Sequence, residues 1–221
     1  MKYINEEVLE QLKEIFSAMK DEVKIALFTK EEPCETCLET RDFVGELVQS
    51  SPKMSLVEYD LEKDSDLAEK LGVSLAPSLA LLDKSGEYKR IKFNGIPSGH
   101  EINSFISSVI AVSGNGQPLP ESITERLSKV NKPVNIKVFV TLGCPHCPGA
   151  VEKAHYLALL NDNITADMIE AQTFYNLSEE YNVSSVPKIV INDIYEFVGN
   201  QPLEVFLEEI EKTQVDRVGS N

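Results

Sequence analysis

Basic residues, cysteines and long apolar stretches are all scarce in this sequence. Its 221 residues include 21 lysines and arginines against 36 aspartates and glutamates, which gives a formal net charge of −15. Both halves of the chain are acidic, whereas nucleic acids and anionic membranes bind clusters of positive charge. We therefore expect neither nucleic acid nor a membrane as a main partner. No apolar run approaches the roughly 18 residues of a membrane-spanning helix.

Other features are missing as well. Residues 1–16 mix charged and apolar side chains and lack the continuous apolar core of a signal peptide, so we predict a soluble protein of the cytoplasm. The nucleotide-binding motif G-x-G-x-x-G is absent, and we expect no cofactor in this chain. Of the three histidines, His100 and His155 have no neighbour at metal-ligand spacing, and we expect both at the surface.

The four cysteines form two C-x-x-C pairs, Cys34 with Cys37 and Cys144 with Cys147. A chain of this length suits one large domain or two of about 100 residues, which bury enough apolar surface to fold without disulfides. Disulfide scaffolds are shorter and scatter their cysteines over many loops. Two interpretations are open at this point: a zinc site made of four thiolates, or two redox-active dithiols.

The chain repeats itself with an offset of 110 residues. The offset superposes the two C-x-x-C pairs, and it also superposes Pro77 on Pro187, each 43 residues after the first cysteine of its pair. Asp60 falls on Glu170 in the same way, and each ends an apolar run. We interpret this pattern as a duplicated domain. The loop-like composition of residues 113–118 divides the chain into units 1–116 and 117–221.

Hydrophobic periodicity predicts the same order of elements in both units: a leading helix, a strand–helix–strand unit, a linking helix, a hairpin and a final helix. In the first unit we expect helices at 4–20, 35–50, 65–71 and 99–112, with strands at 23–28, 54–59, 78–82 and 88–93. In the second unit we expect helices at 121–130, 145–160, 174–181 and 202–212, with strands at 134–140, 164–170, 187–191 and 194–198. Each C-x-x-C pair then lies where the first strand of its unit meets the following helix.

This order of elements resembles the thioredoxin fold, as do the C-x-x-C pair at the first strand–helix junction and a proline preceded by Ala76 or Val186 before the third strand. Two such units in tandem, each with its own C-x-x-C pair, resemble the glutaredoxin-like protein disulfide oxidoreductases of archaea and thermophilic bacteria. The resemblance covers nearly the whole chain. It implies an α/β protein made of two tandem thioredoxin-fold units, each a central mixed four-stranded sheet flanked by helices.

The resemblance also implies a function, protein dithiol–disulfide oxidoreduction by thiol–disulfide exchange, with protein disulfides or dithiols as substrates. Because the chain has no nucleotide motif, its electrons come from a separate partner, which the resemblance implies is a thioredoxin-reductase-like flavoenzyme. Two alternatives stay open. One is a chaperone-like module that binds polypeptides in the groove between the units, and the other is a structural zinc protein.

Thiol–disulfide exchange needs an attacking thiolate and a second thiol that resolves the mixed disulfide. We assign Cys34 and Cys144 as the attacking thiols, because a helix N-terminus stabilises negative charge, and Cys37 and Cys147 as the resolving thiols. The two pairs lie in separate folding units, whereas zinc ligands turn back toward one metal. We therefore favour redox chemistry and expect no metal.

Pro77 and Pro187 are the second pair of candidate site residues. In the fold that this chain resembles, the proline is cis, faces the C-x-x-C pair and offers no N–H beside the sulfurs. The resemblance implies that the backbone of Ala76 and Val186 pairs with an extended substrate segment. The alternative is that each proline only begins an edge strand.

Three further residues are candidates for tuning the cysteine pKa values. Asp60 and Glu170 end matching strands, so each is a candidate for a partly buried carboxylate with a raised pKa that takes a proton from the resolving thiol. The alternative is a solvated charge, with Glu58 as the inward carboxylate instead. His146 lies inside the second pair, where it supplies a hydrogen bond or a positive charge near the attacking thiol, and the sequence C-P-H-C resembles the active site of strongly oxidising thioredoxin-fold proteins.

The two sites are expected to differ in the acidity of their attacking thiols. Glu31, Glu32 and Glu35 surround the first attacking thiol, whereas a proline and His146 follow the second. Nearby carboxylates disfavour a thiolate and a histidine favours it. We therefore predict that Cys144 has the lower pKa, by about one unit.

Overall fold

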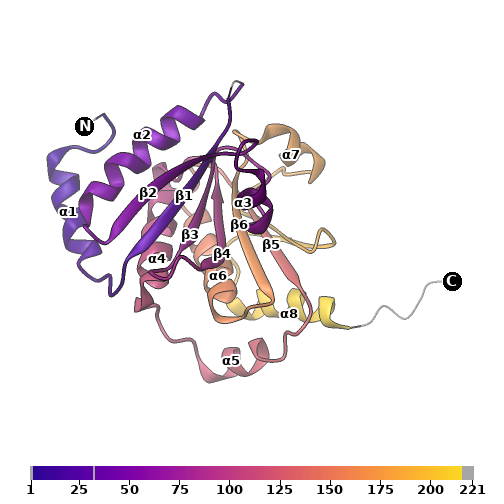
Figure 1. Cartoon of the computed structure of the whole chain (residues 1–221). Helices are drawn as coiled ribbons and strands as arrows, with labels where there is room; N and C mark the ends of the chain where they lie inside the picture. The colour runs from indigo at the N-terminus through magenta and orange to yellow at the C-terminus, as the bar shows by residue number, and fades with distance from the viewer. Residues whose placement is uncertain (1, 32, 216–221) are drawn as a thin grey trace.

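Eight strands form one continuous mixed sheet in the computed structural model, which describes residues 2–31 and 33–215 (Figure 1). Their bounds are Val23–Thr29 (β1), Met54–Asp60 (β2), Ser78–Leu82 (β3), Tyr88–Asn94 (β4), Val134–Val140 (β5), Ile164–Glu170 (β6), Lys188–Ile191 (β7) and Tyr195–Val198 (β8). They lie in the order β2-β1-β3-β4-β6-β5-β7-β8. Each half of the chain thus contributes four neighbouring strands.

Both halves repeat one pattern of strand pairing. β1 is parallel to β2 and antiparallel to β3, which pairs antiparallel with β4, and β5 to β8 repeat this arrangement. The mixed four-stranded sheet predicted for each unit is confirmed. β4 also pairs in parallel with β6, from Ile91 beside Ala166 to Asn94 beside Ile169, and this pairing joins the two sheets. Consequently the carboxyl ends of β1, β4, β5 and β6 lie at one edge of the joined sheet.

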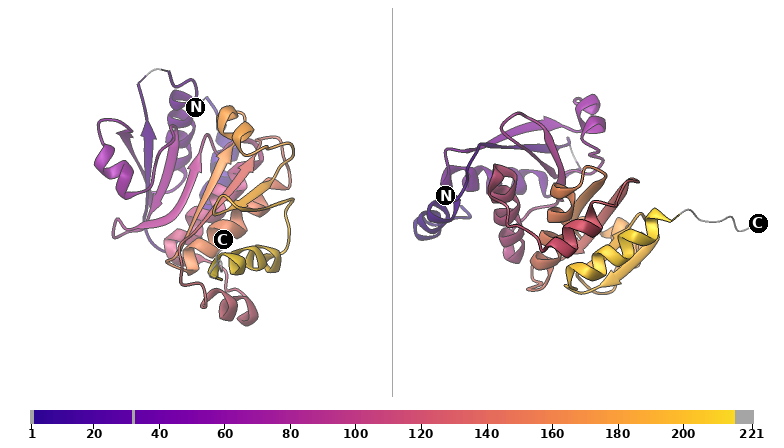
Figure 2. Two further views of the ribbon diagram at one scale, coloured as in Figure 1. Left: turned by 90° about the vertical axis from the view of Figure 1, so that its right-hand side faces the viewer. Right: turned by 90° about the horizontal axis from the view of Figure 1, so that it is seen from below.

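Helices cover both faces of the sheet (Figure 2). They are α1 (Glu6–Phe16), α2 (Cys37–Leu47), α3 (Ser65–Lys70), α4 (Ile102–Ile110), α5 (Glu121–Leu127), α6 (Cys147–Leu160), α7 (Tyr175–Glu180) and α8 (Leu203–Gln214), with shorter turns η1 (Val48–Ser50), η2 (Gly99–Glu101) and η3 (Ala111–Asn115). Successive strand residues point to opposite faces. Ile25 and Leu27 join the large core with α1, α2, α4, α5, α6 and α8, whereas Ala26 and Phe28 pack with α3 and Phe139 packs with α7.

Two helices begin later than the sequence predicts. α2 begins at Cys37 instead of residue 35, and α6 begins at Cys147 instead of residue 145. Thr36 and His146 are the capping residues, and neither makes a side-chain capping hydrogen bond. In each unit the disulfide holds the first cysteine in a turn in front of the helix, so this residue precedes the helix N-terminus.

The segment between η3 and α5 contains the predicted boundary between the units. Just before this segment, Gly114 within η3 has a φ of 89°, a conformation that glycine adopts without strain. The division at residues 116 and 117 stays a prediction, because the two units share one sheet. None of the helices within residues 2–31 and 33–215 combines the length and the apolar character that a membrane span requires.

Candidate functional site

Two disulfides lie at the same edge of the sheet, beyond the carboxyl ends of β1 and β5. Cys34 is bonded to Cys37 and Cys144 to Cys147, and the two Cα atoms are 5.5 Å apart in each pair. This separation is usual for a disulfide. Within the described part of the chain, no three histidine, cysteine or carboxylate side chains are grouped to hold a metal ion. Each C-x-x-C pair is therefore the oxidised form of a dithiol–disulfide couple.

The outer and inner cysteines of each pair differ in exposure. Cys37 is 6% exposed and Cys147 is fully buried, whereas Cys34 is half-buried and Cys144 retains 9% of its surface. An attacking sulfur has to reach the disulfide of another molecule, while a resolving sulfur has to reach only its neighbour. The exposure agrees with attack by the outer cysteine in both units, and these roles stay a prediction.

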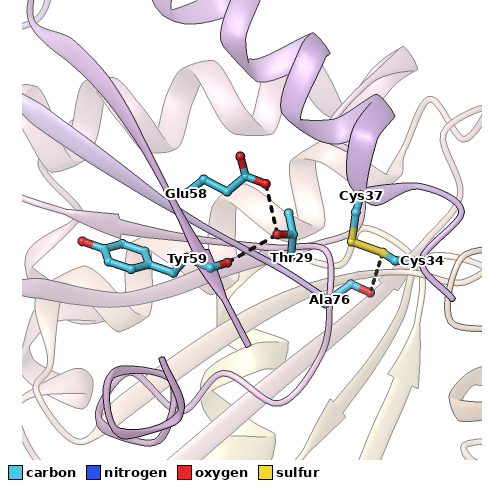
Figure 3. The surroundings of a disulfide bond; sticks show 6 residues. All are labelled: Thr29, Cys34, Cys37, Glu58, Tyr59 and Ala76. Carbon is cyan, nitrogen blue, oxygen red and sulfur yellow. Dashed lines mark hydrogen bonds between the residues drawn. A yellow bond between two sulfur atoms is a disulfide. The ribbon is translucent and has the colours of Figure 1, made fainter. Parts of the chain in front are cut away.

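A cis peptide bond borders each disulfide. The two bonds are Ala76–Pro77 and Val186–Pro187, and both are cis as the resemblance implies. Cys34 Sγ lies 3.8 Å from the carbonyl oxygen of Ala76 (Figure 3), and Cys144 Sγ lies 3.9 Å from that of Val186. The backbone before each proline therefore lies beside the sulfur that is nearer the surface.

Asp60 caps the turn that follows β2. Its Oδ1 accepts the backbone N–H groups of Glu62 at 3.0 Å and Lys63 at 2.9 Å. The hydrogen bond from Lys63 is the main reason that the pKa of Asp60 is lowered from its usual value, so the raised pKa predicted from the sequence is wrong. Glu58, the alternative carboxylate, is 40% exposed and accepts the Thr29 hydroxyl at 3.1 Å (Figure 3).

Glu170 caps the equivalent turn in the second unit. Its side chain is 2% exposed, and its carboxylate accepts the backbone N–H groups of Gln172 at 3.2 Å and Thr173 at 2.6 Å. It lies against the first unit, because a β-carbon on Gly95 would be only 2.6 Å from the Glu170 Cβ atom. Glu170 lines a cleft together with Cys34, so this carboxylate borders the disulfide of the other unit, and its role in proton transfer stays a prediction.

A cleft of about 750 Å³ opens at the first disulfide. Its lining includes Cys34, Glu35 and Glu39 from the first unit and Glu170, Gln172 and Phe174 from the second. The joined sheet brings these segments together, because β6 runs beside β4 and ends at the same edge as β1. The first disulfide is thus surrounded by residues of both units.

The carboxylates expected around Cys34 are present only in part. Glu35 is exposed and lines the cleft, whereas Glu31 forms an ion pair with Lys63. Glu32 lies outside the described residues. A neighbouring cation and the solvent both weaken the field of a surface carboxylate at a nearby thiolate. The lower acidity predicted for the first attacking thiol therefore depends mainly on the cleft carboxylates.

One of the three histidines departs from its predicted position. His146 is exposed beside the second disulfide, and its effect on Cys144 stays a prediction. His100 is exposed, as predicted. His155 is buried, so its predicted surface position is wrong. Its Nδ1 atom lies 2.9 Å from Ser108 Oγ, and burial lowers the pKa of His155 to about 3.

Glu101 is a buried carboxylate that the sequence does not single out. It is fully buried at the end of η2, which packs against α6, the helix that begins at Cys147. The Ser104 hydroxyl donates to its Oε2 atom, while its Oε1 atom has no hydrogen-bond partner among the described residues. Burial raises the pKa of Glu101 to about 7, and the charge of Glu152 adds to this rise.

The first unit also holds the loop in front of the second disulfide. The His100 N–H donates to the carbonyl oxygen of Leu142 at 2.9 Å. Gly99 approaches the same carbonyl so closely that a β-carbon would lie 2.5 Å from the oxygen. The turn η2 therefore contacts the loop before Cys144, and it also packs against the helix that begins at Cys147. No motif in the sequence marks this arrangement, because it arises from packing between the units.

Comparison with solved structures gives close neighbours. The alkylhydroperoxide reductase AhpF of Enterococcus faecalis is 31% identical with a TM-score of 0.88, and the match covers 94% of this chain and 99% of that chain. A protein disulfide oxidoreductase from Aeropyrum pernix is 29% identical with a TM-score of 0.85, and the match covers 96% of both chains. Both likenesses extend over the two units.

Comparison with known sequences agrees with these neighbours. A family profile described as a thioredoxin domain matches residues 134–212. The F component of alkyl hydroperoxide reductase from Staphylococcus aureus is 28% identical over 189 residues, which are 86% of this chain and 34% of that protein. The chain thus spans about a third of the length of the curated relatives it matches. It belongs to the family of tandem thioredoxin-fold disulfide oxidoreductases, whose reaction is thiol–disulfide exchange.

Proposed function

We propose that this chain carries electrons between a flavin-dependent reductase and protein disulfides. The observation that supports this most is the pairing, in each unit, of a buried inner cysteine with an outer cysteine beside the backbone of a cis proline. In the reduced chain, the outer thiolate attacks a substrate disulfide and one substrate sulfur leaves as a thiolate. The inner thiolate then attacks the outer sulfur and releases the second substrate sulfur. Two electrons pass to the substrate, and the disulfide of the chain forms.

Turnover requires a source of electrons. A dithiol of a thioredoxin-reductase-like flavoenzyme would reduce the disulfide of this chain by the same exchange in the opposite direction. The absence of a G-x-G-x-x-G motif supports an external source, and so does the similarity to the F component of alkyl hydroperoxide reductase, of which this chain spans 34%. The confinement of all four cysteines to C-x-x-C pairs fits a reducing compartment, and the proposed compartment is the cytoplasm.

Glu101 is the proton acceptor that we assign to the second site. Cys147 has to lose its thiol proton before it attacks, and it does so in a fully buried position. A carboxylate whose pKa is about 7 accepts this proton at neutral pH and returns it in the opposite direction of exchange. Its Oε1 atom makes no hydrogen bond within the described part of the chain and so has a lone pair available for a proton, and η2, which carries Glu101, packs against α6.

Reduction of insulin disulfides by a dithiol reductant tests the proposal. We expect the intact chain to accelerate the reaction, and we expect each variant with one remaining C-x-x-C pair to retain part of the acceleration. The variant in which all four cysteines are replaced by serine should fall to the rate of the reductant alone. Binding of unfolded insulin chains without acceleration would overturn the proposal and favour a chaperone-like module. Bound zinc that shields the thiols would favour the structural zinc protein instead.

A further inference from the structure

The wall of the cleft opposite Cys34 belongs to the second unit. Gly95 donates its N–H to the carbonyl oxygen of Pro77 at 2.9 Å, and Glu170 packs directly on Gly95. The φ of 101° at Gly95 and the close approach of Glu170 leave no space for a side chain between the two units there. The turn that follows Glu170 therefore begins beside the cis proline of the first site and continues along the cleft.

This wall is absent from the repeat-related position in the second unit. β8 occupies the place that β4 has in the first unit, but β8 lies at the end of the sheet and no strand of the described chain pairs with its other side. The two disulfides therefore have different surroundings, although the sequence is duplicated. The first disulfide borders a cleft with walls from two units, while the second lies next to an open end of the sheet.

The charged residues of the cleft are predominantly acidic. Glu35 and Glu39 lie on the side of α2, Glu170 lies on the opposite wall, and Lys30 is the cation among the lining residues. The formal charge of the whole chain, −15, has the same sign. The carboxylates of the cleft therefore attract a positively charged segment at low ionic strength. At physiological salt this attraction is screened beyond about 8 Å.

We propose that the first site takes extended polypeptide segments that carry basic side chains next to their cysteine, and that residues 172–176 of the second unit form one wall of their binding site. This inference rests on the proposed exchange function and names its substrate class at Cys34. The cleft of about 750 Å³ has room for several side chains of such a segment. The carbonyl of Ala76, 3.8 Å from Cys34 Sγ, lies where the segment would pass.

The test uses the full chain with the second pair replaced by serine, so that only the first pair reacts. The protein is reduced, freed of reductant and mixed with one of two matched peptide disulfides, whose cysteines are flanked by lysine or by glutamate. In the single turnover, the dithiol of the chain becomes its disulfide and the peptide disulfide becomes two thiols. We expect the lysine peptide to react about fivefold faster at low salt, with a smaller ratio at high salt.

Substitutions on the opposite wall then separate this inference from a general effect of charge. Gln172→Lys with Asn176→Lys adds two positive charges at exposed positions of the wall, and we expect the fivefold preference to disappear. Glu62→Gln with Asp66→Asn changes the net charge equally at the repeat-related exposed positions of the first unit, and we expect the preference to persist. Two outcomes would overturn the inference. One is that both peptides react at equal rates with the chain whose wall is unaltered, and the other is that the two double substitutions have equal effects on the preference. Exchange with neither peptide would overturn the proposed function itself.

Discussion

Replacement of Glu101 by glutamine should make the stability of the protein less dependent on pH. The pKa of this carboxyl is raised from 4.5 to about 7 in the folded protein, mainly by burial. Between these two values the folded protein binds more protons than the unfolded chain, so its stability falls as the pH rises through this window. One pKa unit corresponds to about 1.4 kcal/mol, and ionisation of Glu101 therefore costs the folded state about 3 kcal/mol above pH 7.

The measurement is urea unfolding of the oxidised chain and of Glu101→Gln near pH 4 and near pH 8. Glutamine resembles the protonated acid, so the substitution should matter little near pH 4, where both states of the wild-type chain hold the proton. Near pH 8 the variant should be more stable than the wild type by about 3 kcal/mol relative to the difference near pH 4. An equal difference in unfolding free energy at both pH values would refute the assignment of a raised pKa to this carboxyl.

The same substitution should impair the second site. In a chain that keeps only the second C-x-x-C pair, Glu101→Gln should slow insulin reduction by about tenfold near neutral pH, because the buried inner thiol loses its proton acceptor. The inflection near pH 7 in the pH–rate profile should disappear. In a chain that keeps only the first pair, the substitution should leave the rate unchanged. Equal slowing in both backgrounds would contradict a role at the second site and indicate a general structural effect.

Three further outcomes are expected. In chains that keep one pair each, Cys144 should be alkylated at a pH about one unit below Cys34, because carboxylates surround Cys34, and the reverse order would contradict the charge argument. Gly95→Ala should lower the free energy of unfolding by about 2–4 kcal/mol, because the φ of this residue is 101° and the new β-carbon would lie 2.6 Å from the Glu170 Cβ atom. An unchanged midpoint of urea unfolding would refute the contact. Burial lowers the pKa of His155 to about 3, so the folded protein binds fewer protons than the unfolded chain between about 3 and 6.5 and loses stability as the pH falls through this range. His155→Phe should reduce that loss when unfolding is compared near pH 4 and near pH 7, and an equal loss in both proteins would contradict the buried neutral ring.

The sequence predicts the order of the elements because apolar spacing reflects which side of a strand or helix meets the core. The joining of the two sheets was not predictable from this spacing. β4 reads as the last strand of a hairpin, and only the pairing of Ile91 with Ala166 and of Asn94 with Ile169 shows that it has a second neighbour. The alternation of side chains along a strand does not depend on whether the strand lies at the edge of a sheet or pairs with a second strand from another unit.

The residues of the candidate site also differ in how well the sequence predicts them. The repeat identifies the cysteines and prolines, because each depends on residues close to it in its own unit. A carboxylate at the end of a strand has two uses, as a turn cap or as a buried base, and the sequence does not distinguish them. Asp60 and Glu170 both proved to accept the backbone N–H groups of the next turn. The buried position of His155 could have been predicted, because the neighbouring Ala154 and Ala158 lie on the part of α6 that faces the core.

The pairing of β4 with β6 explains why each site depends on the other unit. It brings Glu170 and the turn after it to the first disulfide, and it brings η2, which follows β4, to the loop and the helix of the second. Two identical thioredoxin-fold units would have equivalent sites if they did not touch. Once they share a sheet, the first unit contributes η2, which contacts the loop before Cys144 and packs against α6, and the second unit supplies a wall to the first site. The difference between the two sites therefore follows from the asymmetry of the joined sheet, in addition to the residues between the cysteines.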